Sequence, residues 1–339
     1  MKLLVVGGDS LTGMALQALL AEQKVEHKVL VGGNLNLLQK MEVAKAVSQY
    51  APDQIINVAS YGNLELAERD ATAARLCDEQ NSLVPAVLAE VCSHLNLPLL
   101  QHSSSFVFDG AKLHPYLEED AANPVCRYGR SKWLGERAIR DTIPTHIILR
   151  TDWVFSEASP AFFQKHIDDC KAQHGKLEIL NHRFSPTPAA DVARVLLAIA
   201  RQIDCIADVW GTYHYCAQQP LSQEVFVEQF LQEAARYDPA LAGVLPKLQL
   251  NKVPVRLPYI ANSVLNGQRL FETFGIKARS RAGAIGAVLR QLYQVPEAVS
   301  GTATAPEVPA IDSSIAAKRV VKKPKSGRRP SRKGGSRKE

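Results

Sequence analysis

The sequence has few of the features that mark secreted, membrane-spanning or metal-binding proteins. No apolar run approaches the roughly 18 residues of a membrane span. The short apolar start is interrupted by Gly7 and Asp9, so we expect no secretory signal. The six cysteines form no C-x-x-C pair, and the nine histidines show no H-E-x-x-H spacing. These absences predict a cytoplasmic protein with reduced thiols and no metal site.

Positive charge is concentrated at the C-terminus. Residues 318–339 hold eleven Lys or Arg and one acid, for a local charge of +10, whereas the whole chain carries +6 and the rest of it therefore −4. Residues 299–339 contain no aromatic residue, so they cannot form a core. We predict a disordered basic tail over residues 296–339. Such a tail either binds polyanions through charge alone or only adds solubility.

Short apolar runs alternate with helical patterns in the first half of the chain. The runs KLLVV, KVLV, QIINVA and THIILR are each next to a segment with helical spacing. This alternation predicts an α/β fold with a Rossmann-like, doubly wound parallel sheet. After Arg150 the alternation weakens, and three helical segments predict a smaller C-terminal lobe. We expect one unit over residues 1–295, with a cofactor lobe mainly in 1–150 plus later returning segments and a substrate lobe mainly in 151–295.

A glycine turn lies where the first strand should pass into a helix. The stretch GGDSLTG, Gly7 to Gly13, fits a G-x-x-x-x-x-G frame with Ser10 in the middle. Such turns bring backbone N–H groups and a helix N-terminus against a pyrophosphate, although a plain tight turn would look the same. The end of the second strand, VLVGGN, offers neither an acid for a ribose hydroxyl nor an arginine for a 2′-phosphate. This signal therefore does not separate NADH from NADPH.

Two further stretches carry candidate catalytic groups. In RYGRSKWLGE, Tyr128 and Lys132 lie four residues apart at the start of a predicted helix, so both can point at one spot. The alternative is a chance Tyr-x-x-x-Lys on a polar helix face. The segment HSSSFVFDG, residues 102–110, is expected at the carboxyl end of the fourth strand, where ligands bind in open α/β sheets. A hydroxyl there can meet Tyr128 across the cleft, or it can satisfy its own turn.

Several segments, taken in order, resemble one family. They are GGDSLTG, PDQIINVASYGNLELAE, SSSFVFDG, PYLEEDAANPVCRYGRSKWLGE, LRTDWVF, SPTPAADVA, GTYHY and ANSVL, and they span about residues 1–293. Together they resemble the extended short-chain dehydrogenases/reductases, most closely the dTDP-4-dehydrorhamnose reductases. The resemblance implies an NAD(P)-dependent oxidoreductase of the dTDP-rhamnose biosynthesis type. Its expected substrate is a nucleotide-linked 4-keto-6-deoxy sugar, and its expected cofactor is NADPH or NADH, with NADPH slightly preferred.

The resemblance also implies roles for individual residues. Tyr128 is the expected proton donor to the substrate carbonyl, and Lys132 is expected to bind the nicotinamide ribose and lower the tyrosine pKa. Ser104 stands where the family has a catalytic Thr. The residues expected to bind the cofactor follow the first three strands or form the catalytic pair: Gly7, Ser10, Leu11, Thr12, Gly13, Asn36, Leu37, Ser60, Tyr61, Tyr128 and Lys132. The residues expected to bind the substrate are Ser104, Ser105 and Trp153.

The sequence departs from the family beside this site. The family usually reads S-T-D-Y-V-F-D-G where this chain reads SSSFVFDG, so Ser105 replaces a substrate-contacting Asp and Phe106 replaces a Tyr. Ser10 stands where a glycine is usual. The lost carboxylate and hydroxyl change the polar groups that discriminate among substrates.

Two classes of function therefore fit the sequence. The first is the reductase. The alternative is a non-catalytic NAD(P)- or nucleotide-sugar-binding regulatory subunit, which would resemble the regulatory subunit of methionine adenosyltransferase. Intact Tyr128, Lys132 and Ser104 favour an enzyme. A homodimer is left open.

Overall fold

Six parallel strands form the central sheet of the computed structural model, which describes residues 1–33, 35–203, 205 and 209–295. The strand order is β2-β1-β3-β4-β5-β10, a doubly wound arrangement in which the chain reverses direction across the sheet between β1 and β3. The predicted Rossmann-like fold is confirmed. The predicted tail, residues 296–339, lies outside the described residues. The strands are β1 (Lys2–Val6), β2 (Glu26–Leu30), β3 (Gln54–Asn57), β4 (Leu99–Ser104), β5 (His146–Thr151) and β10 (Gly211–Tyr215).

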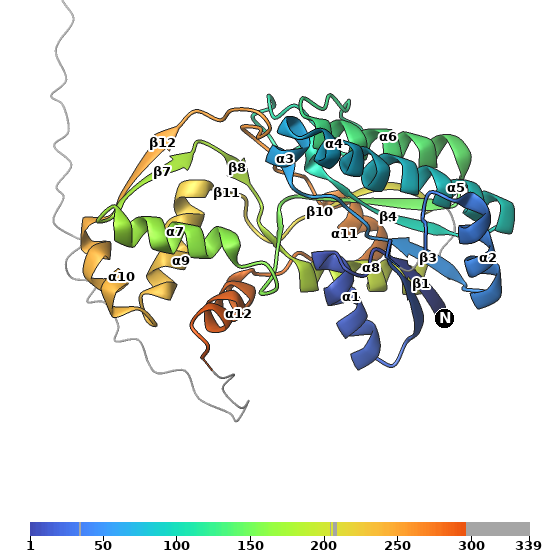
Figure 1. Ribbon diagram of the computed structural model, residues 1–339, viewed down its shortest axis with the longest axis horizontal. Helices are drawn as coiled ribbons and strands as arrows, with labels where there is room; N and C mark the ends of the chain where they lie inside the picture. The colour runs from blue at the N-terminus through green and yellow to red at the C-terminus, as the bar shows by residue number, and fades with distance from the viewer. Residues whose placement is uncertain (34, 204, 206–208, 296–339) are drawn as a thin grey trace, which may run out of the picture. The chain divides into compact units, whose positions relative to one another are not determined.

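Helices cover both faces of this sheet because its strands are apolar on both sides (Figure 1). In β1, Leu3 and Val5 pack on one face while Leu4 and Val6 pack on the other, as the two-residue period of a strand requires. One face is covered by α1 (Leu11–Glu22), α8 (Ala189–Gln202) and α11 (Gln268–Phe274). The other is covered by α2 (Lys40–Tyr50), α5 (Val84–Leu95) and α6 (Arg127–Thr142), and α3 (Leu64–Arg69), α4 (Ala71–Asp78) and the π-helical turn η1 (Glu79–Leu83) contact α6.

A second lobe is built mainly from the later residues around an aromatic core. Phe163, Phe226 and Phe230 are fully buried there. Its helices are α7 (Ala161–Ala172), α9 (Gln223–Ala234), α10 (Pro239–Val244) and α12 (Ala282–Leu292), with the 3-10 turn η3 (Leu245–Lys247). Its strand pairs are β7 (Lys176–Leu180) with β12 (Gln249–Val253), β8 (Arg183–Phe184) with β11 (Leu221–Ser222), and β6 (Val154–Phe155) with β9 (Thr187–Pro188).

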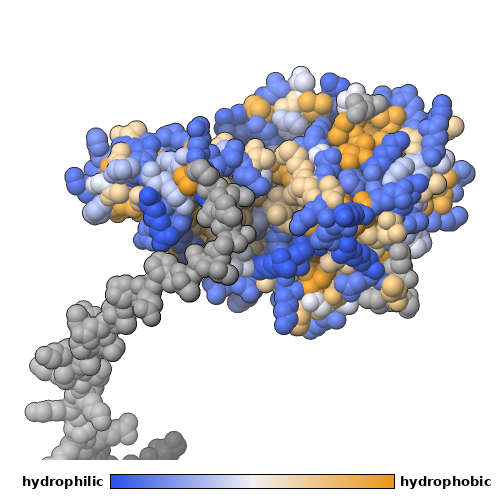
Figure 2. All heavy atoms as spheres, turned by 90° about the horizontal axis from the view of Figure 1, so that it is seen from below, coloured by the Kyte–Doolittle hydropathy of each residue, from blue (hydrophilic) through white to orange (hydrophobic). Residues whose placement is uncertain are grey.

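Most of the face seen in Figure 2 is hydrophilic, with apolar side chains in small groups. Met14 on α1 is an example of an exposed apolar side chain, and scattered residues of this kind are normal on a protein surface. In the part of the chain that the structure describes, no helix combines the length and apolar character needed to cross a membrane.

Candidate active site

The glycine turn after β1 is built for close backbone packing. Gly7 has φ +84°, and a Cβ there would lie 2.2 Å from the backbone N and Cα of Ala59, which follows β3. Ser10 caps α1, because its hydroxyl accepts a hydrogen bond from Gly13 N and donates one to Gly7 O. The first turn of α1 therefore lies directly at the carboxyl edge of β1, where its N–H groups favour an anion.

We expect Gly7→Ala to destabilise the fold by at least about 2 kcal/mol, because it combines positive-φ strain with a clash against backbone. The measurement is urea unfolding. The matched control is Gly33→Ala, because Gly33 lines the same cavity and a Cβ there would meet nothing within 4 Å; we expect a change below about 0.5 kcal/mol. Equal stability of both variants would contradict the packing role of Gly7.

Two adjoining cavities lie along this edge of the sheet, and Asp9, Ser10 and Ser60 line both of them. One, of about 650 Å³, includes Gly32, Asn36 and Leu37 beyond the end of β2. The other, of about 480 Å³, extends to Tyr128 and Lys132. Their continuity past the α1 N-terminus fits a dinucleotide, with the adenosine side near Asn36 and the reactive side near Tyr128. The tight glycine turn between them fits a pyrophosphate.

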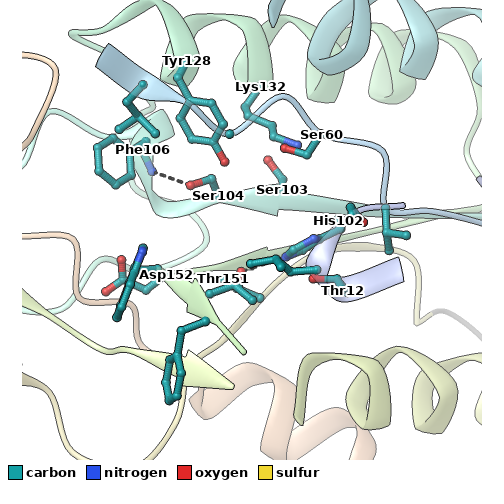
Figure 3. Close-up of a pocket in the computed structure, with 18 of the residues that line it drawn as sticks. Thr12, Ser60, His102, Ser103, Ser104, Phe106, Tyr128, Lys132, Thr151 and Asp152 are labelled. Carbon is teal, nitrogen blue, oxygen red and sulfur yellow. Dashed lines mark hydrogen bonds between the residues drawn. The ribbon is translucent and has the colours of Figure 1, made fainter. Parts of the chain in front are cut away.

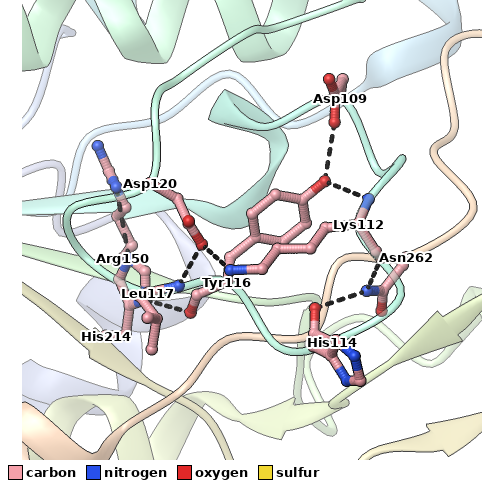
Figure 4. Close-up of polar contacts among 9 residues, drawn as sticks. All are labelled: Asp109, Lys112, His114, Tyr116, Leu117, Asp120, Arg150, His214 and Asn262. Atoms are coloured by element: carbon pink, nitrogen blue, oxygen red, sulfur yellow. Dashed lines mark hydrogen bonds and ion pairs between the residues drawn. The ribbon is translucent and has the colours of Figure 1, made fainter.

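A long loop leads from β4 and the 3-10 turn η2 (Ser105–Val107) to α6 and is fixed by polar contacts (Figure 4). The Tyr116 hydroxyl donates to Asp109 and accepts from Lys112 N, while the Tyr116 ring stacks on Phe108 at 4.1 Å. The side-chain amide of Asn262, which lies between β12 and α11, donates to the Lys112 carbonyl. In addition, the backbone N–H of His214 in β10 donates to Glu118 Oε1 at 2.9 Å, so the loop before α6 is bonded both to the sheet and to the segment around Asn262.

Gly129 allows the start of α6 to approach η2 closely, because a Cβ at this position would lie 2.0 Å from the Phe106 carbonyl oxygen. The approach brings the Tyr128 ring edge-on to Phe106, with centroids 5.9 Å apart. The Lys132 ammonium lies 5.9 Å from the Tyr128 ring centroid. Figure 3 shows the side chains of Tyr128, Lys132, Ser104 and Ser60 pointing toward one part of the cavity. The structure therefore brings together the three residues expected to be catalytic, Tyr128, Lys132 and Ser104, with Ser60, which was expected to bind the cofactor.

Burial controls the protonation of this cluster. It raises the pKa of Tyr128 to about 12, against the lowering effect of the Ser104 and Ser60 hydroxyls. The direction is opposite to the one expected from Lys132, because desolvation of the phenolate is the largest effect. Burial also lowers the pKa of Lys132 to about 8. Tyr128 is therefore protonated at neutral pH, as a proton donor must be.

Ser104 and Ser105 have different surroundings although they are adjacent. Ser104 lines the cavity, and its hydroxyl accepts a hydrogen bond from Phe106 N at 3.3 Å. Ser105 is fully buried and is not among the residues lining either cavity; its hydroxyl donates to Asp152 Oδ1 at 3.0 Å. The expected contact between Ser105 and substrate therefore has no support in the geometry, because Ser105 is absent from the cavity lining and its hydroxyl is bonded to Asp152.

The other residues predicted to bind cofactor or substrate also fall into two groups, those that line a cavity and those that do not. Tyr61 also lies outside both cavities, and its backbone N–H is held by Asn81 Oδ1. Gly13 contributes through packing and the Ser10 cap rather than through the cavity wall. The predicted residues that do line a cavity are Gly7, Ser10, Leu11, Thr12, Asn36, Leu37, Ser60, Ser104, Tyr128, Lys132 and Trp153.

Sequence reasoning missed His102 and Asp152, which also line the reactive cavity. His102 Nε2 lies 2.8 Å from Thr151 Oγ1, and burial lowers the pKa of His102 to about 3, so the ring is neutral. Asp152 follows β5, and burial raises its pKa to about 6 against the effect of its hydrogen-bond donors. The sequence could have pointed to Asp152, because this residue directly precedes Trp153, a predicted substrate contact, in TDWVF.

A parallel sheet with a glycine turn, and a Tyr-x-x-x-Lys pair facing a serine at its carboxyl edge, are the features of an extended short-chain dehydrogenase/reductase. The family model described as RmlD substrate binding domain matches residues 1–294. The chain belongs to this family, that of the dTDP-4-dehydrorhamnose reductases.

Two curated relatives illustrate the match. The dTDP-4-dehydrorhamnose reductase of Sinorhizobium fredii is 31% identical over 283 residues, which cover 82% of this chain and 93% of the relative. The enzyme of the same name from Burkholderia thailandensis is 30% identical over 305 residues, which cover 86% and 99%.

Solved structures agree on the fold. The dTDP-4-dehydrorhamnose reductase of Clostridium acetobutylicum matches with a TM-score of 0.70 at 23% identity, covering 86% of this chain and 98% of that one. The Bacillus anthracis reductase, solved in complex with NADP, matches with a TM-score of 0.69 at 20% identity and covers 87% and 99%.

Proposed function

We propose that this protein reduces the C4 carbonyl of a nucleotide-linked 4-keto-6-deoxy sugar, of the dTDP-4-dehydrorhamnose type, with NADPH or NADH. The observation that carries the proposal is the convergence of Tyr128, Ser104 and Lys132 on a cavity that adjoins a second one at Asp9, Ser10 and Ser60, the two together fitting a dinucleotide. Curated relatives at 29–31% identity carry the name dTDP-4-dehydrorhamnose reductase and support the choice of substrate class.

Each residue at the site has a separate role in the proposed reduction. A bound nicotinamide supplies the hydride. Tyr128 donates a proton to the carbonyl oxygen, and Ser104 donates a hydrogen bond to the same oxygen as negative charge develops on it. Lys132 holds the nicotinamide ribose and favours the tyrosinate left after proton transfer. Trp153 offers an apolar wall for the sugar nucleotide, since it lines the cavity and packs on Phe155 and Phe162.

The cofactor is held at the α1 N-terminus and in the cavity beyond β2. That cavity is lined by Glu42 and Glu79 and, within the described chain, by no lysine or arginine. The 2′-phosphate that distinguishes NADPH from NADH would therefore have no cationic partner in the described lining. The lining gives no preference for NADPH, so both cofactors should be tested in every assay.

The regulatory-subunit alternative is not favoured, because the proton donor, the lysine and the serine are all present and the curated relatives named above are reductases. We also propose a cytoplasmic location, which the six unpaired cysteines support. A homodimer and the binding of polyanions by residues 296–339 remain proposals, and those residues lie outside the described chain.

The direct test is cofactor oxidation with a panel of nucleotide sugars. We expect NADPH or NADH to be oxidised with dTDP-4-dehydrorhamnose and not with dTDP-glucose, which has no C4 carbonyl. Saturable cofactor binding without oxidation on any 4-keto sugar would favour the regulatory subunit. No saturation by either cofactor at millimolar concentration would reject both functions.

A further inference from the structure

Asp152 is a buried acid at the carboxyl end of β5, between the sheet and the second lobe. It is 3% exposed, and a carboxylate in such a place is costly unless hydrogen-bond donors surround it. Donors come from three separate segments. Ser105 of η2 donates to Oδ1 at 3.0 Å, while Ser263 Oγ at 3.0 Å and the backbone N–H of Ser185 donate to Oδ2. One side chain therefore ties together three chain segments that are far apart in sequence.

The bond to Ser105 affects the catalytic wall directly. Ser104 and Phe106, the neighbours of Ser105 in the chain, line the cavity, whereas Ser105 does not line it and donates to Asp152. Ser104 is the proposed hydrogen-bond donor to the carbonyl, and Phe106 contacts the Tyr128 ring edge-on. A fixed Ser105 therefore also fixes Ser104 and Phe106, which together set the position of the Ser104 hydroxyl relative to the Tyr128 hydroxyl. The residue after Asp152 is Trp153, so the same anchor also fixes the apolar wall.

We propose that Asp152 is a positioning residue, which aligns Ser104, Phe106 and Trp153 with the bound substrate by accepting hydrogen bonds from Ser105, Ser185 and Ser263. Its kinetic consequence rests on the proposed reductase function; its structural consequence does not. The role needs hydrogen bonds to these three residues rather than negative charge. An asparagine can keep the three bonds, because its carbonyl oxygen can accept from Ser185 and Ser263 while its NH₂ group donates to the Ser105 hydroxyl.

The test compares Asp152→Ala, Asp152→Asn and Ser105→Ala with the wild-type chain. We expect Asp152→Ala and Ser105→Ala to lower kcat on dTDP-4-dehydrorhamnose by about 10–100-fold, the typical cost of misplaced catalytic groups. Cofactor Kd should stay within about three-fold, because Asp152 does not line the cavity proposed for the adenosine side and its side-chain bonds go to Ser105, Ser185 and Ser263. Asp152→Asn should keep kcat within about three-fold of wild type. The double variant Ser105→Ala/Asp152→Ala should be no slower than the worse single variant, since either change alone already removes the bond between Ser105 and Asp152.

A second measurement does not need turnover. Hydrogen–deuterium exchange at the Phe106 amide, whose N–H donates to Ser104 Oγ, should be about ten-fold faster in Ser105→Ala and Asp152→Ala and unchanged in Asp152→Asn. This pattern in a protein without reductase activity would reject the proposed function and keep the positioning role.

Three results would overturn the proposal. Asp152→Asn as slow as Asp152→Ala would mean that the negative charge itself acts on the substrate. Ser105→Ala with wild-type kcat and exchange would mean that the bond positions nothing. Exchange that rises equally in all three variants and across the whole β5 region would indicate a general stability effect. If Asp152→Ala does not fold, Ser105→Ala and Asp152→Asn still test the positioning role. The first removes only a hydroxyl group and the second only replaces one carboxylate oxygen by an NH₂ group, so we expect both variants to fold.

Discussion

We expect Tyr128→Phe to lower kcat for sugar reduction by about 10²–10⁴-fold, the usual contribution of a general acid. The variant removes only the hydroxyl, so the ring keeps its edge contact with Phe106 and the start of α6 keeps its packing. Cofactor affinity should change by less than about three-fold, because Lys132 still provides the ribose contact. Steady-state kinetics on the keto sugar and fluorescence titration of the cofactor measure the two effects separately.

Tyr293→Phe is the matched control for Tyr128→Phe. Its hydroxyl donates to Asp238 at 3.3 Å in the second lobe, and Tyr293 lines neither cavity. We expect its kcat to remain at the wild-type value. A Tyr128→Phe enzyme that retains half of the wild-type kcat would assign Tyr128 to structure, and another group would have to supply the proton.

Glu136→Gln should destabilise the protein by about 3–5 kcal/mol, the cost of breaking a buried ion pair by removing one partner. The Glu136 side chain is fully buried and accepts from Arg150 at 2.7 and 2.9 Å, from Arg140 at 2.6 Å and from Ser103 at 2.6 Å. Arg150 is only 2% exposed, so the variant leaves its charge buried without a counterion. Urea unfolding at pH 7 measures the loss.

The pH dependence gives an independent check on Glu136. Burial alone would raise its pKa, but Arg150 and then Arg140 overcome this and lower the pKa to about 2 from an ordinary value of 4.5. A lowered pKa in the folded state contributes stability above the unfolded pKa and loses it as the pH falls. The difference between wild type and Glu136→Gln should therefore be full above pH 4.5 and shrink toward pH 2.

Glu233→Gln is the control for this experiment. Glu233, near the end of α9, forms a surface ion pair with Arg236, just beyond the helix, and such pairs contribute about 0–1 kcal/mol. A Glu136→Gln protein as stable as the Glu233→Gln protein would contradict the structural role of the buried pair.

The sequence predicted the features that arise from local patterns. The apolar runs form the parallel strands, and GGDSLTG forms a turn from strand to helix in which Ser10 caps the helix. The four-residue spacing of Tyr128 and Lys132 placed both on one side of α6, as helical geometry requires. These predictions succeeded because each depends on residues close together in the chain.

The sequence could not predict effects that depend on distant partners or on burial. Ser105 and Asp152 are 47 residues apart, and no periodic pattern links them, so the resemblance alone suggested a substrate contact for Ser105. The direction of the Tyr128 pKa shift depends on how deeply the ring is buried, which the spacing to Lys132 does not reveal. The pairing of β7 with β12 likewise joins segments separated by α8, β10 and α9.

The most direct test of the proposed reduction is the transfer of deuterium from cofactor to sugar. NADPH or NADH carrying deuterium at the transferable C4 position of the nicotinamide is incubated with dTDP-4-dehydrorhamnose and the full-length protein, and the product is examined by NMR and mass spectrometry. We expect one deuterium at C4 of the reduced sugar with the wild-type protein, and no detectable deuterated sugar in the Tyr128→Phe reaction run for the same time. Cofactor oxidation without deuterium at C4, or a sugar recovered with its carbonyl intact, would contradict the proposed reduction.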